Sequence, residues 1–274
     1  MERRRVLCAL AGASLGVLSK GSLGVVVRAQ KAEGSRGQAS KGSEFPQEST
    51  IVLVHAAWAD GSCWSNVVVP LEQRGLQVIC APIPLTSLTD DTTALRRALE
   101  RTTGPVILVG HAYSGAVIAA VREDRVKALV YISALAPDEG ETVAKVFYLN
   151  PNSPEAPKMV PDSHGFVWLP EDAFHRALAQ KATAEQARIA AAVQRPIGVQ
   201  CIQEPAPAPT WKSKPSWYLV AEEDRMINPK SQRFMAHRMG AKIHAHPVDH
   251  TSMYADPQVV VDVILEAARQ TLPG

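Results

Sequence analysis

The chain has 274 residues, of which 46% are hydrophobic and 20% charged, and its formal net charge is +2. This length allows one large domain or two small ones, the small net charge gives no reason to expect a nucleic-acid partner, and no apolar run reaches the ~18–20 residues of a membrane-spanning helix. The four cysteines lack metal-ligand spacing and are expected to be buried as small hydrophobes, with one disulfide left open as an alternative. They are Cys8, Cys63, Cys80 and Cys201.

Residues 1–30 have the layout of an export signal. The segment MERRRVLCALAGASLGVL places three arginines before an apolar run of small residues and leucines. Its RRRVL sequence resembles the twin-arginine type of signal, which carries folded proteins; a disordered basic tail is the alternative. Residues 31–49 are rich in Gly, Ser and Lys and predict a flexible linker. We therefore expect a protein that is exported, to the periplasm, and whose folded domain spans 50–274.

From residue 50 onward, strand patterns alternate with helix patterns. Continuous apolar runs rich in β-branched residues predict strands that are buried on both faces. These strands are expected at 50–55, 76–83, 106–110, 127–135, 216–224 and 241–247. Helices are expected through about residue 75 and over 90–102, 114–123, 229–240 and 256–270. This alternation predicts an α/β protein with a doubly wound, mostly parallel sheet.

The interval 136–214 interrupts this rhythm. It is rich in Pro and Ala and contains a helical stretch over 171–194. An insertion of this length between two strands predicts a helical cap that shapes a substrate pocket, the alternative being an excursion that only covers the sheet. His164 and Trp168 are expected to point from the cap into the pocket, with exposed loop positions as the alternative. Trp58, after the first strand, is expected to line the same pocket or to pack in the core.

Four segments carry polar or small residues directly after predicted strands. In chain order they are LVHAAW at 53–58, GHAYSG at 110–115, EEDRMINP at 222–229 and DHTSM at 249–253. They resemble the oxyanion loop, nucleophile elbow, acid-bearing strand end and histidine loop of the α/β-hydrolase superfamily, in particular its small esterase and hydroxynitrile-lyase-like branch. The resemblance implies an α/β-hydrolase fold over about residues 50–270, with the site at the carboxyl ends of the strands.

The resemblance also implies roles for single residues. His250 would act as general base or acid, and Asp224 would hold its ring and stabilise the imidazolium. Asp249 is the alternative acid, although neighbouring residues on an extended chain point apart. The main-chain N–H groups that match the oxyanion donors belong to Ala57 and Tyr113.

The elbow departs from the pattern of the superfamily, because matching without gaps places Ala112 at the position of the nucleophilic serine. Ser114 then lies in the first turn of the following helix, rotated by ~200° from Ala112. A competing register makes Ser114 the nucleophile, but it requires the strand to run through His111 and Ala112, whereas the apolar run stops at Gly110. We expect Ala112 at the tip, Ser114 as the alternative nucleophile and His111 as a structural neighbour.

Two further candidates are weaker. Cys63 could replace the missing nucleophile, but a cysteine at a helix start is expected to be buried instead. His244 and His246 share one face of a predicted strand near His250, which raises the question of a metal site. Outward-facing strand histidines are the favoured interpretation, and no metal or cofactor is expected.

Four functions fit these residues. The chain could be an exported ester or amide hydrolase using Ser114. It could instead use the His250–Asp224 pair without a serine, as a base in lyase, isomerase or cofactor-free oxygenase chemistry or to activate water. It could bind a small molecule without turnover, or carry Ala112 in place of a natural serine as a substrate-trapping variant. Retention of Asp224 and His250 favours catalysis, and the expected substrate is a small ester- or carbonyl-containing molecule. The sequence indicates no oligomeric state.

Overall fold

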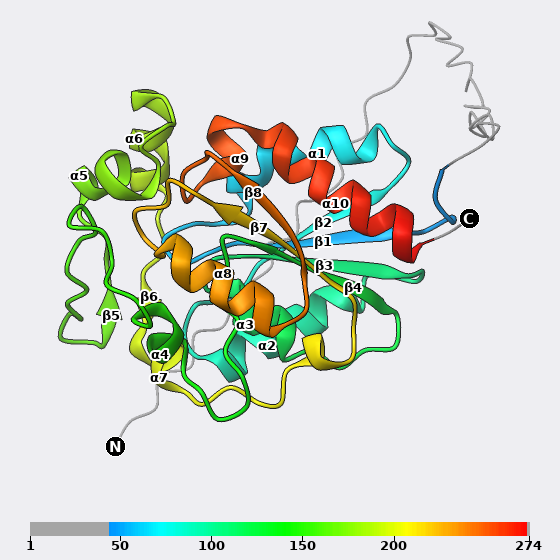
Figure 1. The fold of residues 1–274 in the computed structure, drawn as a ribbon, viewed down its shortest axis with the longest axis horizontal. Coiled ribbons are helices and arrows are strands. Elements are labelled where there is room, and N and C mark those ends of the chain that lie inside the picture. Colours follow the sequence, from blue (N-terminus) through cyan, green and yellow to red (C-terminus); the bar gives the residue numbers. More distant parts are fainter. Residues whose placement is uncertain (1–43, 273–274) are drawn as a thin grey trace, which may run out of the picture. The chain divides into compact units, whose positions relative to one another are not determined.

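A six-stranded, all-parallel sheet forms the centre of the fold in the computed structural model, which describes residues 44–272 (Figure 1). The strand order is β2-β1-β3-β4-β7-β8. The bounds are Thr50–Val54 (β1), Gln77–Ala81 (β2), Val106–His111 (β3), Val126–Ile132 (β4), Ser216–Ala221 (β7) and Lys242–His246 (β8). The chain runs outward from β1 to β2 and then returns to β3, so the direction of winding reverses between β1 and β3. Ligands bind at such a switch point in open α/β sheets.

Alternate residues of the central strands enter two different apolar cores. Ile51 and Leu53 of β1 pack in one core, while Val52 and Val54 pack in the other. This period of two follows from strand geometry and explains why the strands read as continuous apolar runs. The predicted α/β class and its parallel sheet are confirmed.

Helices cover both faces of the sheet. On one face lie α1 (Ser65–Glu72), α9 (Ser252–Ala255) and α10 (Pro257–Thr271), and on the other lie α2 (Leu88–Leu99), α3 (Ser114–Ala119) and α8 (Pro229–Arg238) (Figure 1). A 3-10 helix over Gly61–Trp64 precedes α1. The helix expected over 114–123 ends at Ala119, and β3 includes His111, one residue beyond its expected end.

The segment between β4 and β7 holds several short elements. They are α4 (Val143–Phe147), β5 (Phe166–Val167), α5 (Glu171–Ala173), a π-helical turn (Phe174–Leu178), α6 (Ala184–Ala192), β6 (Ile197–Gly198), α7 (Val199–Gln203) and a 3-10 turn (Thr210–Lys212). The expected helical stretch over 171–194 is thus broken. Ala179 leaves helical dihedral angles, and Thr183 starts α6 with a capping box shared with Gln186.

The N-terminal predictions fall mostly outside the described residues. The export signal predicted at 1–30 and most of the linker predicted at 31–49 belong to this part. The described end of the linker needs a correction, because Phe45 and Ser49 are 2% and 1% exposed and are therefore packed. Phe45 joins the apolar core beneath α10, since its ring gains more from burial than from a free position in solvent. No helix within residues 44–272 has the length and hydropathy needed to cross a membrane.

Candidate active site

The turn between β3 and α3 places Ala112 at its tip. Ala112 has φ 50°, in the left-handed region that side-chain-bearing residues adopt only under local constraint. Its N–H donates to the Ile132 carbonyl at 3.2 Å, and its own carbonyl accepts from the Leu135 N–H at 2.8 Å, so the end of β4 holds the tip. A Cβ at Gly115 would overlap the Leu135 carbonyl oxygen, so α3 packs against this segment with no room for a side chain.

Ser114 lies on a different side of the turn. It is fully buried, and its hydroxyl donates to the main-chain carbonyl of His55, after β1. This bond joins the elbow to the oxyanion loop. Ser114 makes no hydrogen bond to His250 and does not line the cavity that His250 and Ala112 share.

His250 and Asp224 lie together at the carboxyl ends of the strands, although 26 positions separate them in the sequence. His250 Nδ1 is 2.7 Å from Asp224 Oδ2, and both residues are buried. Because an ionised carboxylate only accepts hydrogen bonds, Nδ1 carries the proton, and Nε2 of a neutral ring is left to accept one. Nε2 has no hydrogen-bond partner among residues 44–272, and His250 lines the cavity.

Main-chain and side-chain donors fix the carboxylate of Asp224. Its Oδ1 accepts from the N–H groups of Met226 and Ile227 at 2.7 and 2.9 Å. Gln232 of α8 donates from Nε2 to Oδ2 at 2.7 Å and accepts from the Ala221 N–H at 3.0 Å. The sequence analysis missed Gln232, and a buried glutamine on an amphipathic helix carries no motif that would have revealed it.

Asp249 does not contact the histidine ring. Its Oδ2 accepts from the Lys181 N–H at 2.7 Å, and its Oδ1 accepts from the Thr251 N–H at 3.1 Å. Burial raises the pKa of this carboxyl above its ordinary value. The alternative acid therefore connects the histidine loop to the cap and is not hydrogen-bonded to His250.

His111 packs directly against His250. Its Nε2 donates to the main-chain carbonyl of His250 at 2.8 Å, and the two ring centroids are 4.8 Å apart. Burial, reinforced by repulsion from a charged His250, holds the pKa of His111 well below its ordinary value. A neutral His111 with its proton on Nε2 fits this bond and holds the backbone of the histidine loop.

Two residues at the ends of neighbouring strands carry the main-chain N–H groups that match the oxyanion donors. Ala57 follows β1 and Tyr113 follows β3, which pair in parallel, and both residues line the cavity. No acceptor within residues 44–272 takes a hydrogen bond from either N–H group. Free N–H groups directed at one point can stabilise an oxyanion.

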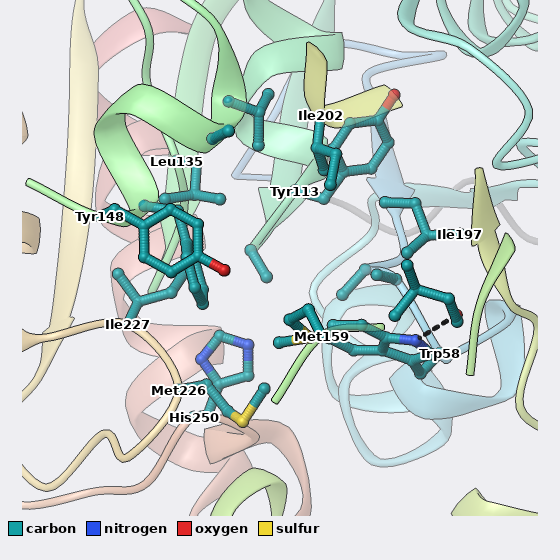
Figure 2. Close-up of a pocket in the computed structure, with 17 residues that line it drawn as sticks. Trp58, Tyr113, Leu135, Tyr148, Met159, Ile197, Ile202, Met226, Ile227 and His250 are labelled. Atoms are coloured by element: carbon teal, nitrogen blue, oxygen red, sulfur yellow. Dashed lines mark hydrogen bonds between the residues drawn. The ribbon is translucent and has the colours of Figure 1, made fainter. Parts of the chain in front are cut away.

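The cavity is lined almost entirely by apolar side chains (Figure 2). Of its lining residues, only Trp58, Tyr113, Tyr148 and His250 have polar side-chain atoms. Two of these are engaged elsewhere, because the Trp58 indole donates to the Val167 carbonyl at 2.9 Å and the Tyr113 hydroxyl donates to Asp91 at 2.7 Å. The other lining residues are Ala56, Ala57, Ala112, Leu135, Val143, Ala144, Phe147, Met159, Val167, Ile197, Ile202, Met226 and Ile227.

The expectation for His164 and Trp168 is corrected. Neither lines the cavity, and Trp168 is 52% exposed, with its indole N–H 3.3 Å from Asp162 Oδ2. Val167 of β5 lines the cavity instead. Successive side chains of an extended segment point in opposite directions, so the inward position of Val167 turns Trp168 outward.

The remaining candidates lie away from the cavity. Cys63 is buried in the apolar core beneath α1. His244 on the edge strand β8 lies 3.0 Å from Glu266, with its Nε2 beside Oε2. Within residues 44–272, no three His, Cys, Asp or Glu side chains gather in a group that could hold a metal ion.

Comparisons of sequence and of overall structure with known proteins identify proteins that are similar to this chain. The sequence model described as the alpha/beta hydrolase family matches residues 51–263. Methylesterase 2 of Arabidopsis thaliana is 26% identical over 259 residues, covering 82% of this chain and 98% of that protein. Among solved structures, polyneuridine aldehyde esterase has a TM-score of 0.70 at 18% identity, covering 80% of this chain and 99% of its own. A pyrethroid hydrolase from Sphingobium faniae JZ-2 has a TM-score of 0.70 at 22% identity, covering 80% and 97%.

Proposed function

The chain belongs to the alpha/beta hydrolase family, and on that premise we propose that it hydrolyses small, largely apolar esters with water activated by His250 and Asp224. The observation that carries the proposal is the 2.7 Å contact between His250 Nδ1 and Asp224 Oδ2, combined with the methyl group of Ala112 at the elbow tip. The base and its orienting acid are present, while the chain offers no hydroxyl at the position of the nucleophile. Water is the nucleophile that such a base can still activate.

The proposed reaction needs only residues already described. His250 Nε2 takes a proton from water, and the water oxygen adds to the ester carbonyl carbon. The negative charge that develops on the carbonyl oxygen is stabilised by the N–H groups of Ala57 and Tyr113. The tetrahedral intermediate then expels the alkoxide, which takes the proton from His250. The products are one carboxylic acid and one alcohol, and the imidazole returns to its starting state.

The walls of the cavity support the proposed substrate class. Most lining side chains are aliphatic, aromatic or methionine, and two of the polar ones are already hydrogen-bonded outside the cavity. A polar substrate group away from the carbonyl would lose its water without a partner, at a cost of roughly 1–3 kcal/mol. This cost favours a substrate whose acyl and alcohol parts are both mainly hydrocarbon. The esterase names of the relatives support ester hydrolysis.

We also propose that the protein acts outside the cytoplasm. The support is the run of arginines followed by an apolar stretch in residues 1–30, which lie outside the described part of the chain.

Hydrolysis of 4-nitrophenyl esters of increasing acyl length tests the proposal. We expect slow turnover, and we expect His250→Ala to lower it by about 10²–10³-fold, within the range for general-base catalysis. Intact-mass spectrometry during turnover should show no acyl group on the chain. Ligand binding without any turnover would favour a non-catalytic binding protein. Loss of activity in Ser114→Ala, with an acyl adduct on the natural chain, would make Ser114 the nucleophile.

A further inference from the structure

Trp58, directly after the oxyanion residue Ala57, is bonded to the cap at two points. Its main-chain N–H donates to the Arg195 carbonyl at 3.1 Å, and its indole N–H donates to the Val167 carbonyl at 2.9 Å (Figure 2). Trp58 has φ 57°, a conformation that costs roughly 1–3 kcal/mol and persists only when its surroundings hold it. The two bonds supply that restraint, and they act one residue away from the Ala57 N–H group.

Tyr113, whose N–H group matches the second oxyanion donor, is held by a buried carboxylate. Its hydroxyl donates to Asp91 Oδ2 at 2.7 Å, and Asp91 is completely buried in α2. The same oxygen lies 3.5 Å from the Cys201 Sγ of α7, and Oδ1 accepts from the Leu85 N–H at 2.6 Å. The proposed reaction gives no role to Asp91, yet this carboxylate connects the elbow to α7.

Both connections reach the cap at or next to the antiparallel pair β5 and β6, which we call the cap ribbon; Cys201 lies in α7, which directly follows β6. Val167 of the ribbon pairs with Ile197, and Arg195 lies two residues before Ile197. Gly198 of the ribbon donates its N–H to the Leu85 carbonyl at 2.8 Å. A Cβ at Gly198 would come within 2.8 Å of the Thr86 carbonyl oxygen, so the ribbon packs closely against the loop that also donates to Asp91.

From these contacts we infer that Trp58 and Asp91 are positioning residues, which fasten the two oxyanion N–H groups to the cap, Trp58 through the cap ribbon and Asp91 through α7. The cap then does more than enclose the substrate, because it sets the geometry of the oxyanion hole. The inference rests on the proposed function insofar as that function uses these two N–H groups. If the Trp58 indole and the Tyr113 ring only packed, removing their hydrogen bonds would have little effect as long as the rings stayed. If they are positioning residues, loss of the hydrogen bond alone should lower activity.

Two substitutions remove those bonds and keep the rings. Trp58→Phe loses the indole donor, and Tyr113→Phe loses the hydroxyl that Asp91 accepts. Trp168→Phe is the matched control, since its exposed indole also bonds within the cap but does not line the cavity. The substitutions are made in the natural chain if it hydrolyses 4-nitrophenyl esters, and otherwise in the Ala112→Ser variant. We expect each test substitution to lower kcat about 10-fold and to leave KM within about 2-fold of the value of that background. Trp168→Phe should change neither.

A binding measurement separates this inference from the proposed function. Phenylacetate and 2-phenylethanol share their ring and carbon chain, but only the carboxylate presents a charged oxygen to the oxyanion N–H groups. NMR titration of the natural chain, Trp58→Phe and Tyr113→Phe should show about 5–10-fold weaker binding of phenylacetate alone in both variants. This result would support the positioning role even if no ester is hydrolysed.

Three outcomes would overturn the inference. They are a rise in KM at constant kcat, an equal loss of affinity for both ligands, and unchanged affinity for phenylacetate. Thermal unfolding shows whether each variant is folded. Trp58→Tyr and Asp91→Asn replace any variant that is not: tyrosine fills more of the indole's volume than phenylalanine does, and the Asp91→Asn amide accepts more weakly than a carboxylate while the Tyr113 hydroxyl is kept.

Discussion

At the scale of single residues, Ala112 presents a methyl group where the resemblance places the nucleophilic serine, and the proposed reaction therefore uses water. Ala112 and His250 line the same cavity, and His250 is already oriented by Asp224. A hydroxyl placed on Ala112 would therefore meet a base whose acceptor nitrogen is available. Ser114, two positions further on, donates its hydroxyl to the His55 carbonyl and cannot serve in its place without breaking that bond.

We predict that Ala112→Ser raises the rate of 4-nitrophenyl acetate hydrolysis by about 10²-fold or more over the natural chain. A serine hydroxyl next to an oriented histidine is an activated nucleophile, and the change adds a single oxygen atom. Steady-state kinetics measures the gain, and intact-mass spectrometry should detect a transient acetyl group on the variant.

Two further variants test whether the gain comes from a serine at position 112 that is activated by His250. Ala112→Ser combined with His250→Ala should lose the gain, because the hydroxyl then lacks its base. Ser114→Ala should leave the rate of the natural chain intact and lower its free energy of unfolding by about 1 kcal/mol, through loss of the bond to the His55 carbonyl. An Ala112→Ser variant no faster than the natural chain would contradict the placement of Ala112 at the nucleophile position.

The lowered pKa of His111 leads us to predict how the free energy of unfolding depends on pH. Its pKa in the folded chain lies well below the ordinary value of 6.5, chiefly because of burial. The unfolded chain therefore binds a proton below about pH 6.5 that the folded chain does not, and stability falls as the pH falls through this value, by at most ~1.4 kcal/mol per pH unit for this group. His55, whose pKa is also lowered by burial, acts in the same direction.

We expect His111→Gln to reduce this pH dependence, since glutamine can keep a donor for the His250 carbonyl without titrating. Urea denaturation at pH 7.5 and pH 5.5 should show that the variant loses about 1 kcal/mol less between the two than the natural chain. Identical losses would mean that His111 is already protonated in the folded state or that other groups carry the dependence.

At the scale of elements, α8 holds the acid of the site in place through the side chain of Gln232. Gln232 accepts from the Ala221 N–H at the end of β7 and donates to Asp224 and to the Ile227 carbonyl, at 3.0, 2.7 and 2.9 Å. One buried side chain thus connects the end of a strand, the acid and the turn that follows it. Three further hydrogen bonds join the site to the cap, from the Trp58 indole to Val167, from Cys201 to Asp91 and from the Lys181 N–H to Asp249.

We predict that Gln232→Leu lowers the free energy of unfolding by about 3 kcal/mol, because it leaves buried backbone groups without partners at roughly 1–3 kcal/mol each. It should also lower the esterase rate, since Asp224 loses one of its donors. Urea denaturation and steady-state kinetics measure the two effects. Gln180→Leu is the matched control, because Gln180 is a half-buried glutamine of the cap with a single hydrogen bond, from Nε2 to the Glu223 carbonyl at 2.7 Å. Equal costs for the two variants would contradict the supporting role of Gln232.

At the scale of the whole molecule, Phe45 and Ser49 are packed near the start of the described residues, and the export signal predicted at residues 1–30 lies outside them. Release of a domain that is already folded would suit a twin-arginine signal.

We predict that fractionation of cells expressing the full chain will recover a shortened protein outside the cytoplasm. Substitution of Arg3, Arg4 and Arg5 by lysine should retain the full-length chain inside, because twin-arginine signals depend on the arginines. A full-length chain in the cytoplasm, with the arginines intact, would show that residues 1–30 are not an export signal.

The sequence by itself determined the fold. Apolar runs of fixed period predicted the strands, and the order of four short segments after those strands indicated the alpha/beta hydrolase family, which the family match confirms. The position of Ala112 relative to Ser114 needed only the angular spacing of a helix. Periodicity within single segments is sufficient to predict the strands and the angular spacing, whereas the family came from the resemblance of those four segments to the alpha/beta hydrolase superfamily.

The tertiary structure decided which distant side chains meet. Three such contacts were not predicted. Gln232 donates to Asp224, and the Tyr113 hydroxyl donates to Asp91. Val167 lines the cavity, where Trp168 had been expected, and most of the other lining residues come from segments far from it in the sequence. Whether a buried polar group faces one neighbour or another depends on how two elements pack and on the single partner that leaves no donor or acceptor unpaired. That information is a property of the assembled core and is not contained in any local pattern.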